Sequence, residues 1–166
     1  MKRTLPYFIF ILTLLGFDQV TKLFLAKQIP YGGSKSIIPG FINLSHVHNR
    51  GAIFGFFNQA GTPLVYLILT LASLTALGLV VYYFIKVPFS ERLLKITLSL
   101  VLAGALGNLA DRLFRGYVID FIDIYIGKYH WPSFNVADSC ISIGAVLLIY
   151  IFFFKKGEKC SLYSSN

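Results

Sequence analysis

The sequence predicts an all-α integral membrane protein with four transmembrane helices and a small β-sheet at the membrane surface. Hydrophobic residues make up 56% of the 166 residues and charged residues only 13%, whereas soluble domains usually carry about 25% charged residues. The apolar residues also fall into four runs of roughly 20 residues, the length that crosses the core of a bilayer. The chain length is that of a single domain, residues 1–166.

The first apolar run predicts a transmembrane helix over about residues 5–26. The opening letters MKR and the apolar residues behind them imitate a secretory signal peptide. No cleavage site of small residues follows, and the run continues through Asp18 and Lys22. We therefore expect the helix to be an uncleaved first span.

The next segment, about residues 27–61, predicts a loop that contains a strand. Pro39 and Gly40 indicate a turn, and residues 41–47 then alternate in the manner of a strand. The loop also carries too many large apolar side chains for a solvated linker. A small sheet that rests at the membrane surface accounts for both features.

Three more apolar runs predict the remaining helices. Thr62 and Pro63 form a typical helix start before the second run. Ser90 and Ser133 are candidate caps for the third and fourth runs. The predicted helices are residues 63–85, 93–114 and 134–154, with a second loop over residues 115–133 and a tail over residues 155–166.

Four spans place both termini on one side of the membrane. Eight Lys and Arg residues fall on that side and seven on the other, so basic residues barely decide the orientation. All five aspartates fall on the loop side. With the termini in the cytoplasm, this face is extracytoplasmic. The net charge of +8 suits anionic lipid headgroups better than nucleic acid, because the basic residues form no continuous stripe.

Four of the five aspartates lie between Asn108 and Asp138, flanked on both sides by membrane-like runs. A carboxylate at membrane depth costs about 2.5–3.5 kcal/mol on insertion scales, so the cluster calls for a function. We interpret Asp120 and Asp138 as a pair that shares a proton and a water molecule and hydrolyses a peptide bond. Asp138 lies near a helix N-terminus, which favours its ionised form. A proton relay or a structural polar cluster would use the same spacing.

Other polar residues are spaced to support this pair. Asn108, Asp111 and Arg112 fall at i, i+3 and i+4 and share one helix face, and Arg112 can pair with Asp111 to shield a buried charge. Asn135 shares a face with Asp138 and can donate to a carboxylate. On the first helix, spacing alone makes Asp18 and Lys22 either part of the site or an interfacial ion pair.

We expect no metal and no cofactor. His46 and His48 would share a face of a strand, but no third ligand has sensible spacing, so we interpret both as ordinary surface histidines. Cys140 falls in an apolar run and Cys160 in the polar tail, which predicts two free thiols.

The residues of five blocks resemble the lipoprotein signal peptidases, also called signal peptidase II, which are bacterial membrane aspartic peptidases. The blocks occur in the family's order and cover nearly the whole chain apart from the tail. They are residues 18–22 (DQVTK), 49–55 (NRGAIFG), 104–112 (GALGNLADR), 118–121 (VIDF) and 134–139 (FNVADS).

This resemblance implies four transmembrane helices in the bacterial inner membrane, cytoplasmic termini and an extracytoplasmic sheet that cradles the substrate. It implies cleavage just before a diacylglyceryl-modified cysteine of a prolipoprotein by Asp120 and Asp138, with Asp123 in a secondary role. It also implies inhibition by globomycin-like cyclic peptides, and we expect a monomer. The residues that would shape the site and hold substrate are Asp18, Lys22, Asn49, Gly51, Asn108, Asp111, Arg112, Asn135 and Ala137.

Two other classes of protein compete with a peptidase. A proton-coupled small transporter would use buried aspartates, but it predicts inverted repeats or helices broken at mid-membrane, and the sequence shows neither. A non-enzymatic membrane assembly factor would not need two carboxylates at such a depth.

Overall fold

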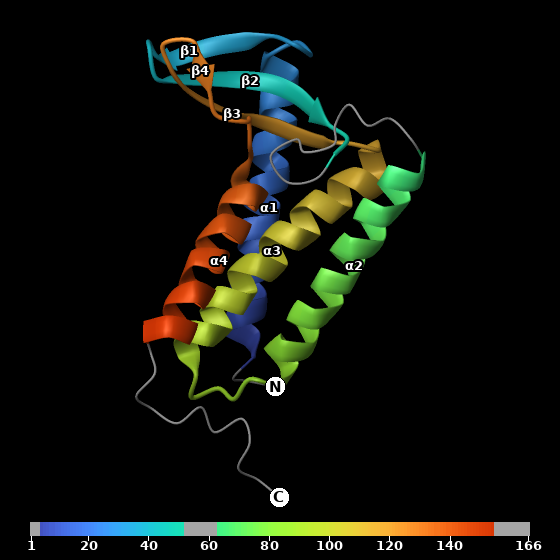
Figure 1. Cartoon of the computed structure of the whole chain (residues 1–166), viewed down its shortest axis with the longest axis vertical. Coiled ribbons are helices and arrows are strands. Elements are labelled where there is room, and N and C mark those ends of the chain that lie inside the picture. The colour runs from blue at the N-terminus through green and yellow to red at the C-terminus, as the bar shows by residue number, and fades with distance from the viewer. Residues whose placement is uncertain (1–3, 52–62, 155–166) are drawn as a thin grey trace, which may run out of the picture.

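The computed structural model describes residues 4–51 and 63–154. The described residues form four long helices that lie side by side, and a small sheet lies across one end of them (Figure 1). α1 begins and α4 ends at the opposite end of the bundle. In chain order the elements are α1 (Leu5–Gln28), β1 (Ser34–Ile38), β2 (Ile42–Asn49), α2 (Pro63–Lys86), α3 (Arg92–Arg115), β3 (Val118–Ile126), β4 (Tyr129–His130) and α4 (Val136–Phe154).

The predicted helices are all present, with ends within two residues of the expected positions. Among the described residues, α1, α3 and α4 are long and apolar enough to cross a membrane, and Leu71–Lys86 of α2 forms a shorter apolar helix. Large apolar side chains cover the outward faces, such as Leu12 at 64% exposure and Phe152 at 74%. The fold is therefore that of a membrane protein with a small antiparallel sheet, whereas the fourth span stays a prediction.

Two helix caps differ from expectation. The residue before α3 is Glu91 rather than Ser90, and its side chain makes no capping bond. α4 begins at Val136, so Asn135 rather than Ser133 occupies its cap position. The predicted cap at Thr62, the end of the first loop and Cys160 lie outside the described residues.

The sheet has the strand order β1-β2-β3-β4, and all of its pairs are antiparallel. The strand expected over residues 41–47 is β2. The second loop, expected over residues 115–133, contains β3 and β4: the chain leaves α3 through Gly116, whose φ of 77° is left-handed, and then enters β3. Asn49 pairs with Val118 and Val47 with Asp120 across β2 and β3. This register brings the end of β2 beside Asp120.

Small residues let α3 and α4 approach closely. A Cβ atom on Gly104 would lie 2.3 Å from the carbonyl oxygen of Ala137, and one on Gly144 would lie 2.5 Å from the Val101 side chain. Such close contact of backbones is typical of helix pairs in membranes. It holds the first turn of α4 against the middle of α3, where the polar residues of both helices meet.

Candidate active site

The two expected catalytic carboxylates come together where the sheet meets the helices. Asp120 lies in β3 and Asp138 in the first turn of α4, and each is only 2% exposed. Figure 1 shows β3 crossing the ends of the helices next to the start of α4. Elements that are far apart along the chain therefore bring two buried carboxylates to one place.

Asn135 links the two carboxylates. Its Nδ2 donates to Oδ1 of Asp120 over 2.7 Å, and its backbone N–H donates to Oδ2 of Asp138 over 3.3 Å. In return, its Oδ1 accepts the backbone N–H of Asp138 over 2.9 Å. One fully buried residue thus fixes both side chains.

Asn49 holds Asp120 from the other side. Its Nδ2 donates to Oδ2 of Asp120 over 2.9 Å, and its Oδ1 accepts the N–H of Gly51 over 2.8 Å. The carbonyl oxygen of Gly51 accepts from Nη2 of Arg112 over 2.9 Å. This chain of bonds ties the end of β2 to α3 beside the carboxylates.

Asn108 holds the carboxylate of Asp138 in the same way. Its Nδ2 donates to Oδ1 of Asp138 over 2.8 Å. Its Oδ1 accepts from Nζ of Lys22 over 3.2 Å and from Nδ2 of Asn135 over 3.3 Å. Both oxygens of each carboxylate therefore accept hydrogen bonds, which restricts rotation of the two groups.

Lys22 is the centre of a buried ionic cluster rather than one half of an interfacial pair. It is 0% exposed, and its Nζ lies 2.8 Å from a carboxylate oxygen of both Asp18 and Asp111. Oδ1 of Asp18 also accepts the backbone N–H of Ala137 over 2.9 Å. Because this N–H belongs to the first turn of α4, the cluster anchors the helix that carries Asp138.

The expected pairing of Arg112 with Asp111 is wrong. Arg115, one turn further along α3, makes the ion pair with Asp111, whereas Arg112 donates to backbone oxygens. Gln19 is a further member that we had not assigned: its Nε2 donates to Asp18 and Asp111 over 3.1 Å each. Two signals in the sequence could have identified these residues. Gln19 directly follows Asp18, and Arg115 lies four residues after Asp111.

Asp123 lies apart from this cluster. Its oxygens accept from Nδ2 of Asn43 over 3.1 Å and lie 2.8 Å from Nδ1 of His130. Ser133 contacts Ser45 over 3.5 Å, and the Ser139 hydroxyl donates to the carbonyl of Asn135. None of these groups reaches Asp120 or Asp138 through a described hydrogen bond.

Burial, and to a smaller extent the nearby negative charge of Asp138, together raise the pKa of Asp120 to about 7. The hydrogen bonds from Asn49 and Asn135 and the charge of Lys22 act in the opposite direction. The two carboxylates interact, so their titration belongs to the pair. Such a pair can hold one proton near neutral pH.

A groove beside α2 extends to Asn108, the residue that donates to Asp138. It has a volume of about 310 Å³, and its walls are mainly apolar side chains of α2 and α3. Small residues such as Ala76 and Ala105 line it, and Asn108 and Arg112 are among its few polar groups. A mostly apolar substrate segment that lies in this groove would reach the residues that hold Asp138.

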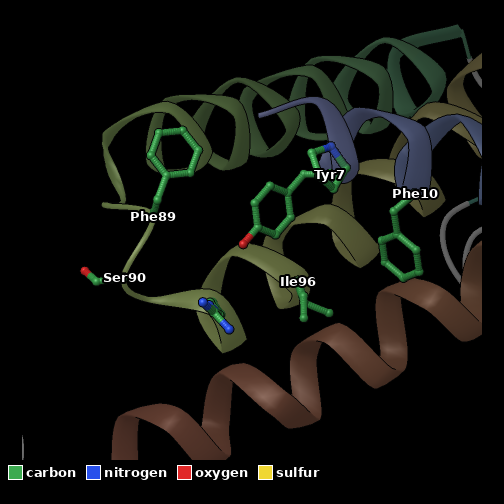
Figure 2. A pocket seen from close by; sticks show the side chains of 7 residues that line it. Tyr7, Phe10, Phe89, Ser90 and Ile96 are labelled. Carbon is green, nitrogen blue, oxygen red and sulfur yellow. The ribbon is translucent and has the colours of Figure 1, made fainter. Parts of the chain in front are cut away.

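A second cavity, of about 770 Å³, lies at the other end of the bundle. Figure 2 shows Tyr7 and Phe10 of α1 and Ile96 of α3 around it. Its described lining contains one charged side chain, Arg92, and no carboxylate. The chemistry of hydrolysis therefore favours the smaller groove.

Within the described residues, no group of three or more His, Cys, Asp or Glu side chains is arranged to hold a metal ion. His46 is 7% exposed, so the expectation that it is a surface residue is wrong. Cys140 is a buried free thiol.

Comparisons with known proteins agree with one another. A family model described as signal peptidase (SPase) II matches residues 10–154. A lipoprotein signal peptidase of Syntrophus aciditrophicus is 45% identical over 93% of this chain and 98% of its own length. One of Burkholderia mallei is 47% identical over 81% of this chain and 79% of its own.

Two solved structures, both described as bacterial membrane enzymes studied by the in meso method, share the fold. The one at 2.3 Å resolution has a TM-score of 0.78 and 34% identity and covers 93% of both chains. The one at 1.9 Å resolution has a TM-score of 0.74 and 33% identity and covers 90% of this chain and 93% of its own. Together with the family match, these likenesses show that the chain belongs to the signal peptidase II family, the lipoprotein signal peptidases.

Proposed function

We propose that this signal peptidase is an aspartic endopeptidase in which Asp120 and Asp138 activate water. Family membership makes the removal of signal peptides from prolipoproteins the reaction to be explained. The observation that supports an aspartic mechanism is the pair of buried carboxylates that Asn135 links. A peptidase also explains this pair better than the transporter or the assembly factor, neither of which needs carboxylates fixed beside a substrate groove.

The mechanism assigns opposite protonation states to the pair. Asp120, with its raised pKa, holds the shared proton, and Asp138 at the start of α4 stays ionised. Asp138 takes a proton from water while the water oxygen adds to the peptide carbonyl carbon. Asp120 gives its proton to the carbonyl oxygen.

The resulting diol collapses in the second half of the reaction. The C–N bond breaks, and the leaving nitrogen takes the proton that Asp138 accepted from water. A diol hydroxyl returns a proton to Asp120, which restores the starting state. The sum is one peptide bond and one water molecule converted to a carboxylic acid and an amine.

The surrounding residues act as positioning groups in this proposal. Asn49, Asn108 and Asn135 hold the carboxylates, and Gly51 and Arg112 hold the chain beside them. Lys22, with Asp18 and Asp111, anchors α4 through the N–H of Ala137. Fixed groups need little reorganisation as charge develops in the transition state.

The proposed substrate is a prolipoprotein whose cysteine carries a diacylglyceryl group, cut just before that cysteine. A signal peptide is an apolar helix, and acyl chains are apolar too, so both suit the groove between α2 and α3. In this arrangement the enzyme is a monomer with four spans, in the bacterial inner membrane. Its termini are cytoplasmic and its sheet is extracytoplasmic. Globomycin-like cyclic peptides would bind between the two carboxylates.

A gel-shift assay tests this function. Purified protein in detergent is incubated with one prolipoprotein, either with or without prior diacylglyceryl modification. We expect the shorter product only from the modified form, because burying acyl chains contributes about 0.8 kcal/mol per CH₂ and positions the scissile bond. Comparable cleavage of the unmodified form would contradict recognition of the lipid and favour a general signal peptidase.

A further inference from the structure

Two histidines on β2 face each other outside the carboxylate cluster. His46 and His48 are two residues apart on the strand, so both side chains project from the same face. Their Nε2 atoms lie 3.1 Å apart, within hydrogen-bond distance. Neither ring makes a described hydrogen bond to Asp120 or Asp138, so the catalytic proposal leaves this pair unused.

The backbone fixes the tautomer of His46. Its Nδ1 lies 2.8 Å from the carbonyl oxygen of Ile29. A carbonyl oxygen only accepts, so the proton is on Nδ1 and a neutral His46 presents a lone pair at Nε2. Histidines that bind metals almost always donate their second ring nitrogen to a carbonyl or carboxylate in this way.

Two tyrosines fix the ring of His48. The Tyr31 ring stacks on it with centroids 4.2 Å apart, and the Tyr117 ring stacks on it at 3.6 Å. Tyr31 is 69% exposed and His48 partly buried, whereas His46 is buried, so ions in solution reach the pair from the side of Tyr31 and His48. Both imidazoles therefore hold their orientation before any ligand arrives.

The distance between the two nitrogens suits a chelated metal ion. A metal bound at about 2.05 Å from each of two nitrogens that are 3.1 Å apart would subtend roughly 98°. This angle lies between square-planar and tetrahedral geometry. We propose that His46 and His48 form a two-ligand site for a divalent transition-metal ion, with Cu²⁺ bound more tightly than Ni²⁺ or Zn²⁺.

Binding requires one proton to move. Nε2 of His46 has no proton, so Nε2–H of His48 donates the hydrogen bond between the rings. To bind the ion, His48 shifts this proton from Nε2 to Nδ1 through solvent, and both Nε2 lone pairs then face the metal. No net proton is released from the neutral pair.

The bound metal ion exchanges with solution and is not required for the fold. Within the described residues, no third His, Cys, Asp or Glu completes the set, so water or donors from another molecule take the remaining positions. The positive charge of Arg50 acts on His48 and opposes a cation. Both features predict reversible binding that a chelator removes without unfolding the protein.

The test uses full-length protein without a polyhistidine tag, in detergent, with Cys160→Ser to remove a competing thiol. Titration with Cu²⁺ should give one equivalent whose electron paramagnetic resonance spectrum shows coupling to two imidazole nitrogens. His46→Gln and His48→Gln should each lose the two-nitrogen spectrum. Each should also bind Cu²⁺ at least about tenfold more weakly. His130→Gln is the matched control and should keep the spectrum, because His130 pairs with Asp123.

A second measurement leaves the histidines in place. Diethylpyrocarbonate modifies accessible imidazoles, and bound Zn²⁺ should protect His48 but not His130, as mass spectrometry of peptides can show. A spectrum with a single nitrogen in the unmutated pair, or no protection of His48 at saturating Zn²⁺, would overturn the proposal. A two-nitrogen spectrum that persists in the double His46→Gln, His48→Gln variant would overturn it too.

Discussion

Asn135 and Asp138 together cap the first turn of α4, because the side chain of each accepts the backbone N–H of the other. The N–H of Asp138 donates to Oδ1 of Asn135 over 2.9 Å, and the N–H of Asn135 donates to Oδ2 of Asp138 over 3.3 Å. This is the reciprocal arrangement of a capping box, with aspartate in place of the usual Glu or Gln. Because the Asn135 amide also holds Asp120, the same residues build the start of the helix and the proposed catalytic pair.

Asp120→Asn and Asp138→Asn should each abolish cleavage while the protein still inserts and purifies normally. An amide keeps the size of the side chain but cannot exchange the proton that the mechanism needs. Asp123→Asn is the matched control and should keep most activity, because Asp123 contacts Asn43 and His130 instead. The gel-shift assay measures all three variants. An inactive Asp123→Asn beside an active Asp120→Asn would mean that the wrong aspartate of β3 is assigned.

The rate of cleavage should fall on the alkaline side of about pH 7. The mechanism needs one proton on the pair, and the raised pKa of Asp120, about 7, marks where that proton is lost. The measurement is kcat/KM against pH with a lipid-modified substrate in a detergent whose charge does not change with pH. A flat profile up to about pH 9 would contradict a shared proton.

The same pKa predicts how stability changes with pH. The folded protein holds the Asp120 proton up to about pH 7, whereas the unfolded chain releases it near 3.8. The contribution of Asp120 to stability is therefore fully present below about 3.8 and is lost as pH rises through about 7. Relative to Asp120→Asn, the unfolding temperature of the unaltered protein should decline between these values.

The sequence was sufficient for the helices because apolar runs of membrane length have few alternatives. It was insufficient for β3, where aspartates three residues apart interrupt the alternation that marks a strand. Arg115 lies four residues after Asp111, the spacing at which side chains on a helix meet, whereas Arg112 follows Asp111 directly, so the pair of Arg115 with Asp111 was predictable. The role of Asn135 depends on three segments that meet in space, so no local pattern could predict it.

Lys22→Met should destabilise the protein strongly. The ammonium group of Lys22 compensates Asp18 and Asp111, which are buried, and its loss would leave buried charge without its shared cation. Breaking a buried ion pair on one side costs about 3–5 kcal/mol. Lys27→Met on the same helix is the control, because Lys27 is exposed and its loss should change the free energy of unfolding by no more than about 0.5 kcal/mol. Unfolding in detergent measures both, and equal stabilities would remove Lys22 from its central role.

Reporter fusions test the orientation. A reporter fused after Lys156 should be active as a cytoplasmic protein, and one inserted beside Ser34, at the start of β1, should be active outside the cytoplasm. The reason is that exported substrates reach carboxylates only at the outer face, since the count of basic residues is nearly balanced. The reverse pattern would place Asp120 and Asp138 at the inner face and exclude processing of exported prolipoproteins.

Gly104→Ala should impair catalysis without contacting either of the proposed catalytic carboxylates. The added Cβ would lie 2.3 Å from the carbonyl oxygen of Ala137 and 2.8 Å from Cγ1 of Ile141. A backbone oxygen cannot rotate away, so α4 must shift, and Asp138 follows Ala137 directly. Overpacking of this kind costs about 1–3 kcal/mol, and a displacement near 1 Å at the reacting groups can cost about 100-fold in rate.

Gly78→Ala on α2 is the matched control for this substitution. Its Cβ would meet nothing within 4 Å, so only the helix preference for alanine acts, about 0.5–1 kcal/mol in favour of the variant. The comparison uses kcat from the gel-shift assay and the unfolding temperature in the same detergent. We expect a lower kcat for Gly104→Ala and an unchanged kcat for Gly78→Ala. Unaltered turnover by Gly104→Ala would mean that close contact of α3 with α4 does not position Asp138, and that the ionic anchor of Lys22 alone suffices.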